Sequence, residues 1–169
     1  GVSSAFTNGS NTFTPDTDGT VRINPHSVAG DTASRAATLT GSSPGFSGNL
    51  ILEAPLSGSS RLTQVPVAAV GTATITVENE NQFFGVNATY NNPITITGDG
   101  FNDGQSSIGA LRLDGGTWNG TITVTGTPGN SSGTAYDARI GGNTTASAIV
   151  LNGAVVGQGR LVLSSRDPD

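Results

Sequence analysis

The chain of 169 residues contains no cysteine, no methionine and no lysine. Without cysteine it can form neither disulfide bonds nor thiolate metal sites. Charged residues make up 11% of the sequence, well below the roughly 25% that is typical of soluble domains. Its seven basic residues are all arginines, spread along the chain and outnumbered by twelve acidic residues. Because nucleic acids and anionic membrane surfaces require a clustered basic face, neither is an expected partner.

Long hydrophobic runs are also missing, and no apolar stretch approaches the ~18 residues of a membrane span. Membrane insertion is therefore not expected. Glycine, serine, threonine and asparagine are abundant instead, a composition that is shared with many disordered chains. The small net charge of -5 and the regular spacing of β-branched apolar runs oppose disorder. We therefore expect one folded domain with a real core.

A short pattern recurs along the sequence: an apolar triplet, a turn that contains glycine, and then Arg-Leu. The segment 50–62 aligns without a gap on 149–161, and a looser copy runs through 94–113. A second pattern, in which threonine alternates with β-branched residues, occurs at 71–77 and again at 120–124. Strand-like pieces that repeat in this way predict a stacked solenoid, since each repeat can bury its apolar face only against its neighbours.

The Arg-Leu pairs place Arg61, Arg112 and Arg160 in phase along the sequence. A ladder of stacked arginines would be repulsive, because like charges at that spacing oppose one another. We therefore expect each of these arginines to pair with a nearby acid or to cap carbonyl groups outside the core.

Short alternating segments separated by glycine-rich turns predict that nearly the whole chain forms β-structure. The strands expected after residue 47 are 49–53, 61–67, 72–78, 93–97, 108–113, 121–125, 146–151 and 160–164, and 83–90 is expected to be a strand or a wide turn. The segment 20–24 is a further expected strand, whereas 33–39 is compatible with a helix or a strand. No segment shows a sustained apolar period of 3.6 residues, which argues against long helices.

The inward positions of these strands carry isoleucine, valine and leucine, and the outward positions carry threonine, arginine and asparagine. Rows of hydroxyl groups are expected on one outer face, formed by Thr76, Thr95, Thr97, Thr121, Thr123 and Thr125. Stacked identical side chains favour pairing of one layer of strands on the next. We therefore predict an all-β fold, a right-handed parallel β-helix with a less regular N-terminal segment. A β-sandwich is the competing interpretation, although it does not predict a recurrence in phase.

Four phrases of the sequence carry a likeness to a known family, and they lie at 50–58, 94–98, 109–113 and 159–163. In these phrases the chain resembles the autotransporter-associated β-strand repeats of bacterial secreted passenger domains. The resemblance implies a surface-exposed parallel β-helix that is adhesive or stalk-like. Residues 1–47 do not match the repeat, so we predict a cap, an extension or an inter-subunit strand there and a β-solenoid domain at 48–169.

Catalytic chemistry finds little support in the sequence. The single histidine, His26, follows Pro25 in a segment without clear periodicity, so a Ser-His-Asp arrangement is not expected. Glycoside hydrolysis requires paired carboxylates, and the candidate pairs are Asp99 with Asp103, Glu78 with Glu80, and Asp16 with Asp18. None of them lies beside a run of aromatic residues or a cluster of arginines. We therefore do not expect an enzyme.

Calcium is the metal ion that the sequence favours, because it requires closely spaced oxygen ligands. Two turns offer a pair of acids beside a flexible glycine, with Asp16 and Asp18 in one turn and Asp99 and Asp103 in the other. Neither turn completes the loop of an EF-hand, and an ordinary Asp-Gly turn is the alternative for both. No other cofactor is expected.

Five asparagines lie two residues before a serine or threonine and are candidates for N-linked glycosylation. They are Asn8, Asn87, Asn119, Asn130 and Asn143. In a secreted protein such sites mark exposed turns. A chain this rich in asparagine, serine and threonine also contains such triplets by chance.

Together these features favour a structural role. We expect an extracellular or cell-surface β-solenoid subunit that self-assembles into, or decorates, a fibre, stalk or sheath, with copies of itself as partners. Main-chain pairing at the exposed end of the stack would join the copies. The alternative is an adhesin or glycan-binding surface module, for which Phe83, Phe84 and Trp118 are the only hints. A polysaccharide-active enzyme is the least favoured interpretation.

Overall fold

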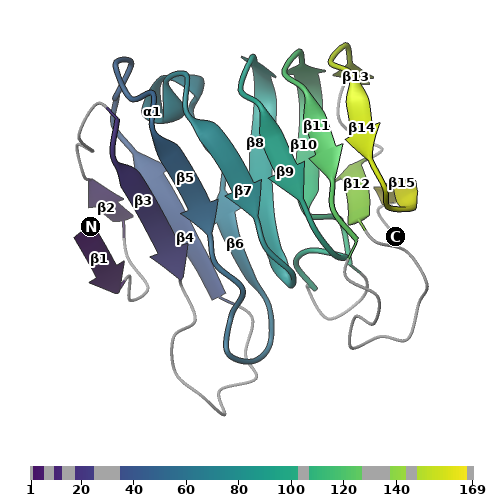
Figure 1. The fold of residues 1–169 in the computed structure, drawn as a ribbon, viewed down its shortest axis with the longest axis horizontal. Coiled ribbons are helices and arrows are strands. Elements are labelled where there is room, and N and C mark those ends of the chain that lie inside the picture. The colour runs from purple at the N-terminus through teal and green to yellow at the C-terminus, as the bar shows by residue number, and fades with distance from the viewer. Residues whose placement is uncertain are drawn as a thin grey trace.

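The computed structural model describes residues 2–5, 10–12, 18–24, 35–102, 107–126, 138–143 and 148–166. Most of these residues form strands, and the strands make two parallel β-sheets that lie one behind the other (Figure 1). In the described ranges the chain has one helix, the single turn α1 (Val67–Val70). The prediction of an all-β fold is therefore confirmed.

The order of the strands in each sheet follows their order along the chain. The first sheet contains β1 (Val2–Ala5), β3 (Thr20–Asn24), β5 (Asn49–Leu52), β7 (Thr74–Val77), β9 (Ile94–Ile96), β11 (Ile122–Val124) and β14 (Val155–Gly157). The second sheet contains β2 (Ser10–Thr12), β4 (Arg35–Thr40), β6 (Ser60–Thr63), β8 (Asn81–Tyr90), β10 (Leu111–Trp118), β12 (Ala138–Asn143) and β15 (Leu161–Arg166). A further strand, β13 (Ile149–Leu151), pairs with the end of β10.

Consecutive strands from β1 to β12 lie alternately in the two sheets. Each strand from β1 to β10 pairs in parallel with the strand two places along, whereas β11 pairs with β14 and β12 with β15. Paired residues are between 19 positions apart, as for Ile75 and Ile94, and 33 positions apart, as for Ile122 and Val155. Parallel strands need a crossover connection, and here the crossover passes through a strand of the opposite sheet. The strands within 1–47 join the same two sheets, so the pairing shows no break at residue 47.

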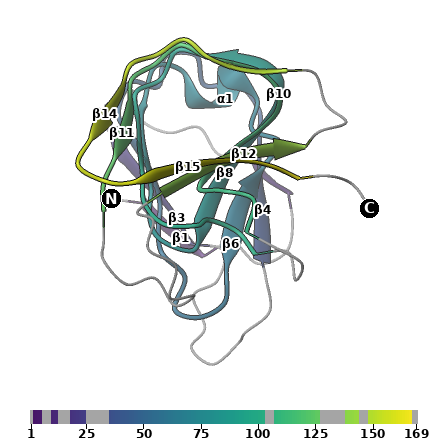
Figure 2. The ribbon, with the colours of Figure 1, turned by 90° about the vertical axis from the view of Figure 1, so that its right-hand side faces the viewer.

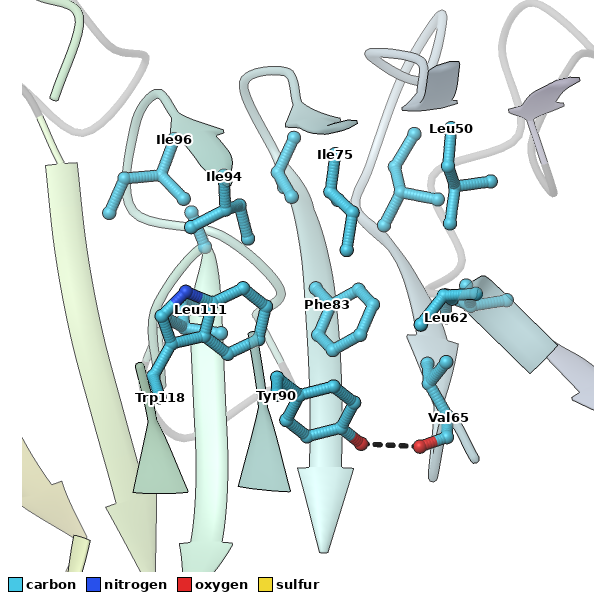
Figure 3. Packing of buried hydrophobic residues seen from close by; sticks show 14 of the residues in the cluster. Leu50, Leu62, Val65, Ile75, Phe83, Tyr90, Ile94, Ile96, Leu111 and Trp118 are labelled. Carbon is cyan, nitrogen blue, oxygen red and sulfur yellow. Dashed lines mark hydrogen bonds between the residues drawn. The ribbon is translucent and has the colours of Figure 1, made fainter. Parts of the chain in front are cut away.

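Alternate residues of the strands point into the space between the sheets and form one core (Figure 3). In the first sheet the main inward row consists of Leu50, Ile75, Ile94 and Ile122. In the second sheet the equivalent row consists of Leu62, Phe83, Leu111 and Ile140. All of these side chains are buried. Each layer covers the apolar side chains of the layer before it. The alternation of apolar residues along a strand therefore favours parallel pairing of the layers in this register.

Three aromatic rings fill the middle of the core (Figure 3). Trp118 and Tyr90 stack with their ring centroids 5.0 Å apart, and Phe83 meets both rings edge-on at 5.5 and 5.3 Å. The Tyr90 hydroxyl donates a hydrogen bond to the carbonyl oxygen of Val65. Burial raises the pKa of Tyr90 to about 12, because desolvation disfavours the phenolate.

Each predicted strand overlaps a strand of the structure, but 108–113 covers only the start of β10, and the sequence did not predict β1, β2, β12 and β14. Two further differences are informative. The segment 33–39, left open between helix and strand, contains most of β4. The expected strand 61–67 ends early, because Gln64 has a positive φ of 50° and Pro66 precedes α1. Proline has no N–H group to donate to a neighbouring strand, so the strand cannot continue through it.

The sequence alignment of 50–62 on 149–161 is not a structural equivalence. The first segment begins on β5 in the first sheet, whereas the second begins on β13, which pairs with β10 of the second sheet. Nor do Arg61 and Arg112 occupy one row of paired residues, so the arginines form no ladder. The recurring sequence pattern reflects the residues that a strand and its turn have in common. It does not indicate which strands pair.

Candidate functional site

Three short strands, β13, β14 and β15, form the C-terminal end of the stack. β14 is the last strand of the first sheet and β15 is the last strand of the second, so each sheet ends there in an edge. Both edges lie on the right-hand side of Figure 1, and Figure 2 looks directly onto them. An edge strand presents main-chain N–H and C=O groups that can pair with a further strand.

Apolar side chains that would be covered elsewhere in the stack are exposed at this end. Val155 continues the row of Ile122 and is 46% exposed, and Leu163 continues the row of Ile140 and is 66% exposed. Of the five exposed large apolar side chains in the described ranges, four lie on β13 to β15 and the fifth is Leu56. Two of the four, Val150 and Val156, pair with Thr117 and Thr123 and therefore lie on the outer faces. We name this uncovered surface of β13, β14 and β15 the apolar end.

A hollow of about 340 Å³ opens at the apolar end between β12, β13 and β15. It is lined by Ile140, Ile149, Leu151, Leu163, Ser164 and Ser165. Its four apolar lining residues and the adjoining strand edges offer the same two kinds of contact that hold the preceding layers together. The arrangement can therefore receive a parallel strand together with apolar side chains that fill the hollow.

A ladder of asparagine side chains leads to the same end along the turns between strands. Asn119 donates from Nδ2 to Oδ1 of Asn91 at 2.9 Å, and Asn152 donates from Nδ2 to Oδ1 of Asn119 at 3.0 Å. Asparagine ladders of this type are typical of stacked parallel strands in register. The ladder therefore fixes the register of the layers that lead to the apolar end.

Two of the four calcium candidates fall within the described residues. The side chain of Asp99 is 5% exposed, and its Oδ1 lies 3.7 Å from Nε of Arg139. Asp18 is exposed in the bend before β3, while Asp16 and Asp103 lie outside the described ranges. The described residues contain no group of three or more acids or histidines that could hold a metal ion. The cation beside Asp99 is thus the protein's own arginine.

Three of the five glycosylation candidates can be placed. Asn87 is exposed on β8 with a left-handed backbone, at a φ of 46°. Asn119 uses its amide nitrogen, the atom that a glycan would occupy, as a donor in the asparagine ladder. Asn143 is half-buried at the end of β12. The remaining candidates, Asn8 and Asn130, lie outside the described residues.

Arginines on the outer face of the second sheet have partners, as expected for Arg112. This guanidinium holds Asp114 with two hydrogen bonds of 2.8 and 2.5 Å and lies over the Phe84 ring, 4.2 Å from its centroid. Arg61 lies over the ring of Phe101 at 4.4 Å, a contact that was not predicted from the sequence. The single histidine, which falls in the segment 25–34, lies outside the described residues.

Comparison with known proteins finds no matching family model, no matching curated protein and no matching solved structure. Within the described ranges, no helix is long and apolar enough to cross a membrane. What the structure establishes is an all-β protein with two parallel sheets. The resemblance to autotransporter-associated repeats stays a prediction.

Proposed function

We propose that the chain is a right-handed parallel β-helix that acts as an extracellular or cell-surface structural subunit and joins copies of itself end to end. The apolar end carries this proposal, because Val155 and Leu163 continue inward rows and yet are exposed. The alternation of parallel strands between two sheets supports the solenoid. Its right hand follows from the strong preference of parallel crossovers.

A second copy covers the apolar end by adding its own first strands in parallel. β1 and β2 form the opposite edges of the same two sheets. Within one copy Val2 pairs with Val21, which belongs to the row of residues that ends at Val155. If the same register continues across the contact, Val2 of the next copy pairs with Val155 of the first copy. Such a head-to-tail contact does not close on itself, so it produces a filament.

The location of the protein outside the cell rests on its composition and on the family resemblance. A chain without cysteine or methionine resists oxidation, and a surface rich in hydroxyl groups and poor in charge suits an exterior material. The adhesin alternative rested on three aromatic residues as candidates for contact with a glycan. Phe83, Phe84 and Trp118 are all buried, so these side chains do not support it. No described side chain therefore favours glycan recognition over assembly.

Sedimentation of the purified chain over a range of concentrations tests the proposal. The wild type should form species larger than one chain, and Leu163→Asp should remain a single chain because it places a carboxylate in the apolar contact. Leu56→Asp is the matched control. Leu56 is 63% exposed, nearly as much as Leu163 at 66%, and lies between β5 and β6, several layers from the apolar end.

Both leucines are exposed in the single chain, so each substitution should change its free energy of unfolding by no more than about 0.5 kcal/mol. A wild type that stays a single chain at every concentration would contradict the proposal. Equal loss of assembly in the Leu163 and Leu56 variants would contradict it too, because the apolar end would then have no special part in the contact.

A further inference from the structure

The outer face of the first sheet carries a two-dimensional set of threonines on and beside β7, β9 and β11. We name it the threonine array, and its members are Thr74, Thr76, Thr95, Thr97, Thr121, Thr123 and Thr125. Thr76 pairs with Thr95, and Thr95 pairs with Thr123, as the sequence predicts. The hydroxyl oxygens of Thr97 and Thr125 lie 2.6 Å apart. Figure 1 looks onto this sheet.

The spacing of the array is set by the geometry of parallel strands. Neighbouring strands lie about 4.8 Å apart, and alternate residues on one strand lie about 6.6 Å apart. Because threonine is branched at Cβ, its χ1 rotamers are restricted, and its hydroxyl and methyl groups are held in order. The hydrogen bond between Thr97 and Thr125 orders them further. The array is therefore a preformed lattice of hydroxyl and methyl groups.

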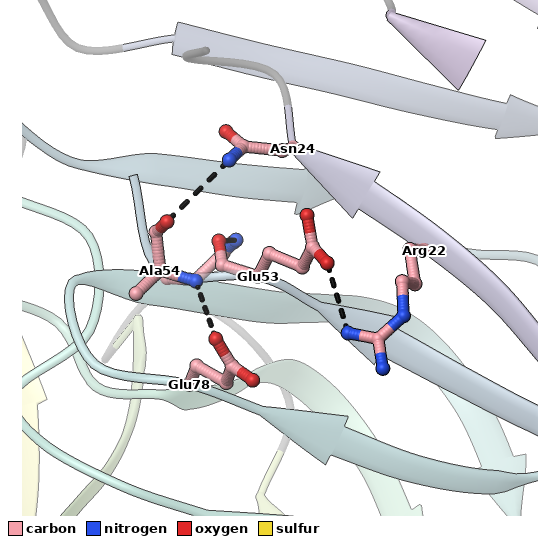
Figure 4. A network of polar contacts seen from close by, with 6 residues as sticks. Arg22, Asn24, Glu53, Ala54 and Glu78 are labelled. Carbon is pink, nitrogen blue, oxygen red and sulfur yellow. Dashed lines mark hydrogen bonds and ion pairs between the residues drawn. The ribbon is translucent and has the colours of Figure 1, made fainter. Parts of the chain in front are cut away.

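The array is electrically neutral. β7, β9 and β11 contain no charged residue, and the charged side chains of this face lie toward β3 and β5 (Figure 4). Arg22 pairs with Glu53 at 2.9 Å, and Glu78 accepts a hydrogen bond from the main-chain nitrogen of Ala54 at 2.9 Å. Glu78 directly follows β7 and borders the array, and its carboxylate is held on the β5 side by this hydrogen bond. The array therefore matches a partner that is neutral and that both donates and accepts hydrogen bonds.

We propose that the threonine array binds the surface of ice. Water oxygens in hexagonal ice repeat along the a axis at a distance close to the spacing of parallel strands. A row such as Thr76, Thr95 and Thr123 can thus hydrogen-bond successive water molecules of one lattice row, and ordered water makes hydrogen bonds nearly as favourable as direct ones. The methyl groups rest between these rows.

Neutral polysaccharides are a weaker match for the same face. Sugar rings stack on exposed aromatic side chains, whereas every aromatic ring of the described residues is buried: Phe46, Phe83, Phe84, Tyr90, Phe101 and Trp118. The array is complete in a single copy of the chain. The inference is therefore independent of end-to-end assembly.

Thermal hysteresis, the gap between the melting and freezing temperatures of an ice crystal in protein solution, tests the proposal. Thr95→Tyr places a ring at the centre of the array and keeps a residue of high β-propensity in the strand. Thr89→Tyr is the matched control, because Thr89 is exposed on β8 of the second sheet, where it pairs with Thr117. Circular dichroism checks that both variants are folded.

The wild type and Thr89→Tyr should both show hysteresis, and a fluorescently labelled wild type should coat a growing ice crystal. Thr95→Tyr should lose both properties. A wild type without hysteresis would overturn the proposal, and so would hysteresis that survives in Thr95→Tyr. Sedimentation with cellulose particles identifies the other partner class: binding that Thr95→Tyr abolishes, in the absence of hysteresis, would also overturn the assignment to ice.

Discussion

Replacing Tyr90 by phenylalanine should remove much of the loss of stability that the protein undergoes in alkaline solution. The sequence has no lysine and no cysteine, so the side chains that titrate between about pH 9 and pH 12 are its two tyrosines, Tyr90 and Tyr136. Tyr136 lies outside the described residues, whereas Tyr90 is fully buried against Trp118 and Phe83. Tyr90 can therefore be tested with little background from other groups.

The size and sign of the effect follow from the pKa of Tyr90. Burial raises this pKa from 10.0 to about 12 in the folded state. The folded state then holds the phenolic proton more tightly than the unfolded chain does. Its stabilising effect is complete below pH 10 and is lost as the pH rises toward 12. The free energy of unfolding should fall by about 1 kcal/mol at pH 11 and about 2 kcal/mol at pH 12.

Urea unfolding, followed by the fluorescence of the single tryptophan, Trp118, measures this dependence. Tyr90→Phe also removes a hydrogen bond to the Val65 carbonyl oxygen, which should cost about 1 kcal/mol at every pH. The informative quantity is consequently the slope against pH. The slope between about pH 9 and pH 12 should be much flatter in the variant than in the wild type. An equal slope in both proteins would refute the reasoning.

Two other substitutions probe the packing of the layers. Trp118→Ala should lower the free energy of unfolding by about 3–5 kcal/mol, because it removes the largest ring of the core; thermal unfolding by circular dichroism measures the loss. Gly120→Ala should be strongly destabilising as well, since a Cβ at this position would overlap the carbonyl oxygen of Asn92. Gly45→Ala is its control, because a Cβ there has no neighbour within 4 Å. Similar unfolding midpoints for the two alanine variants would show that the layers are not packed as closely as described.

Many of the strands were predictable from the sequence because one face of each of them is buried. β1, β2, β12 and β14 were not predicted, and β14 has no buried residue. Alternation of apolar and polar residues marks a strand with one buried face, and Ile75, Ile94 and Ile122 are buried residues of β7, β9 and β11. The threonine rows were predictable for the same reason, since threonine occupies the outward positions beside them. The local pattern of apolar and polar residues was thus sufficient to predict a strand wherever buried and exposed positions alternate.

Strand pairing was not predictable in the same way. The turns absorb insertions, so paired residues are separated by 19 positions in one layer and 33 in another. A gapless alignment assumes a constant separation, and it therefore matched β5 with β13, which lie in different sheets. The sequence also could not separate a buried Trp118 from an exposed one, because its burial depends on contacts with Tyr90 and Phe83.

The apolar end could not be predicted from the sequence for a related reason. Val155 and Leu163 occupy inward positions, just as Ile122 and Ile140 do. Their exposure arises because no described strand follows β14 or β15 in the two sheets. Only the order of the strands in space distinguishes the last layer from those before it.

X-ray fibre diffraction from aligned filaments of the wild-type chain tests the end-to-end assembly most directly. If the two sheets continue from copy to copy, the strand spacing of about 4.8 Å lies along the filament axis. The pattern should then contain a strong meridional reflection at that spacing. Filaments in which this reflection falls on the equator, or a chain that forms no filaments, would contradict assembly through the apolar end.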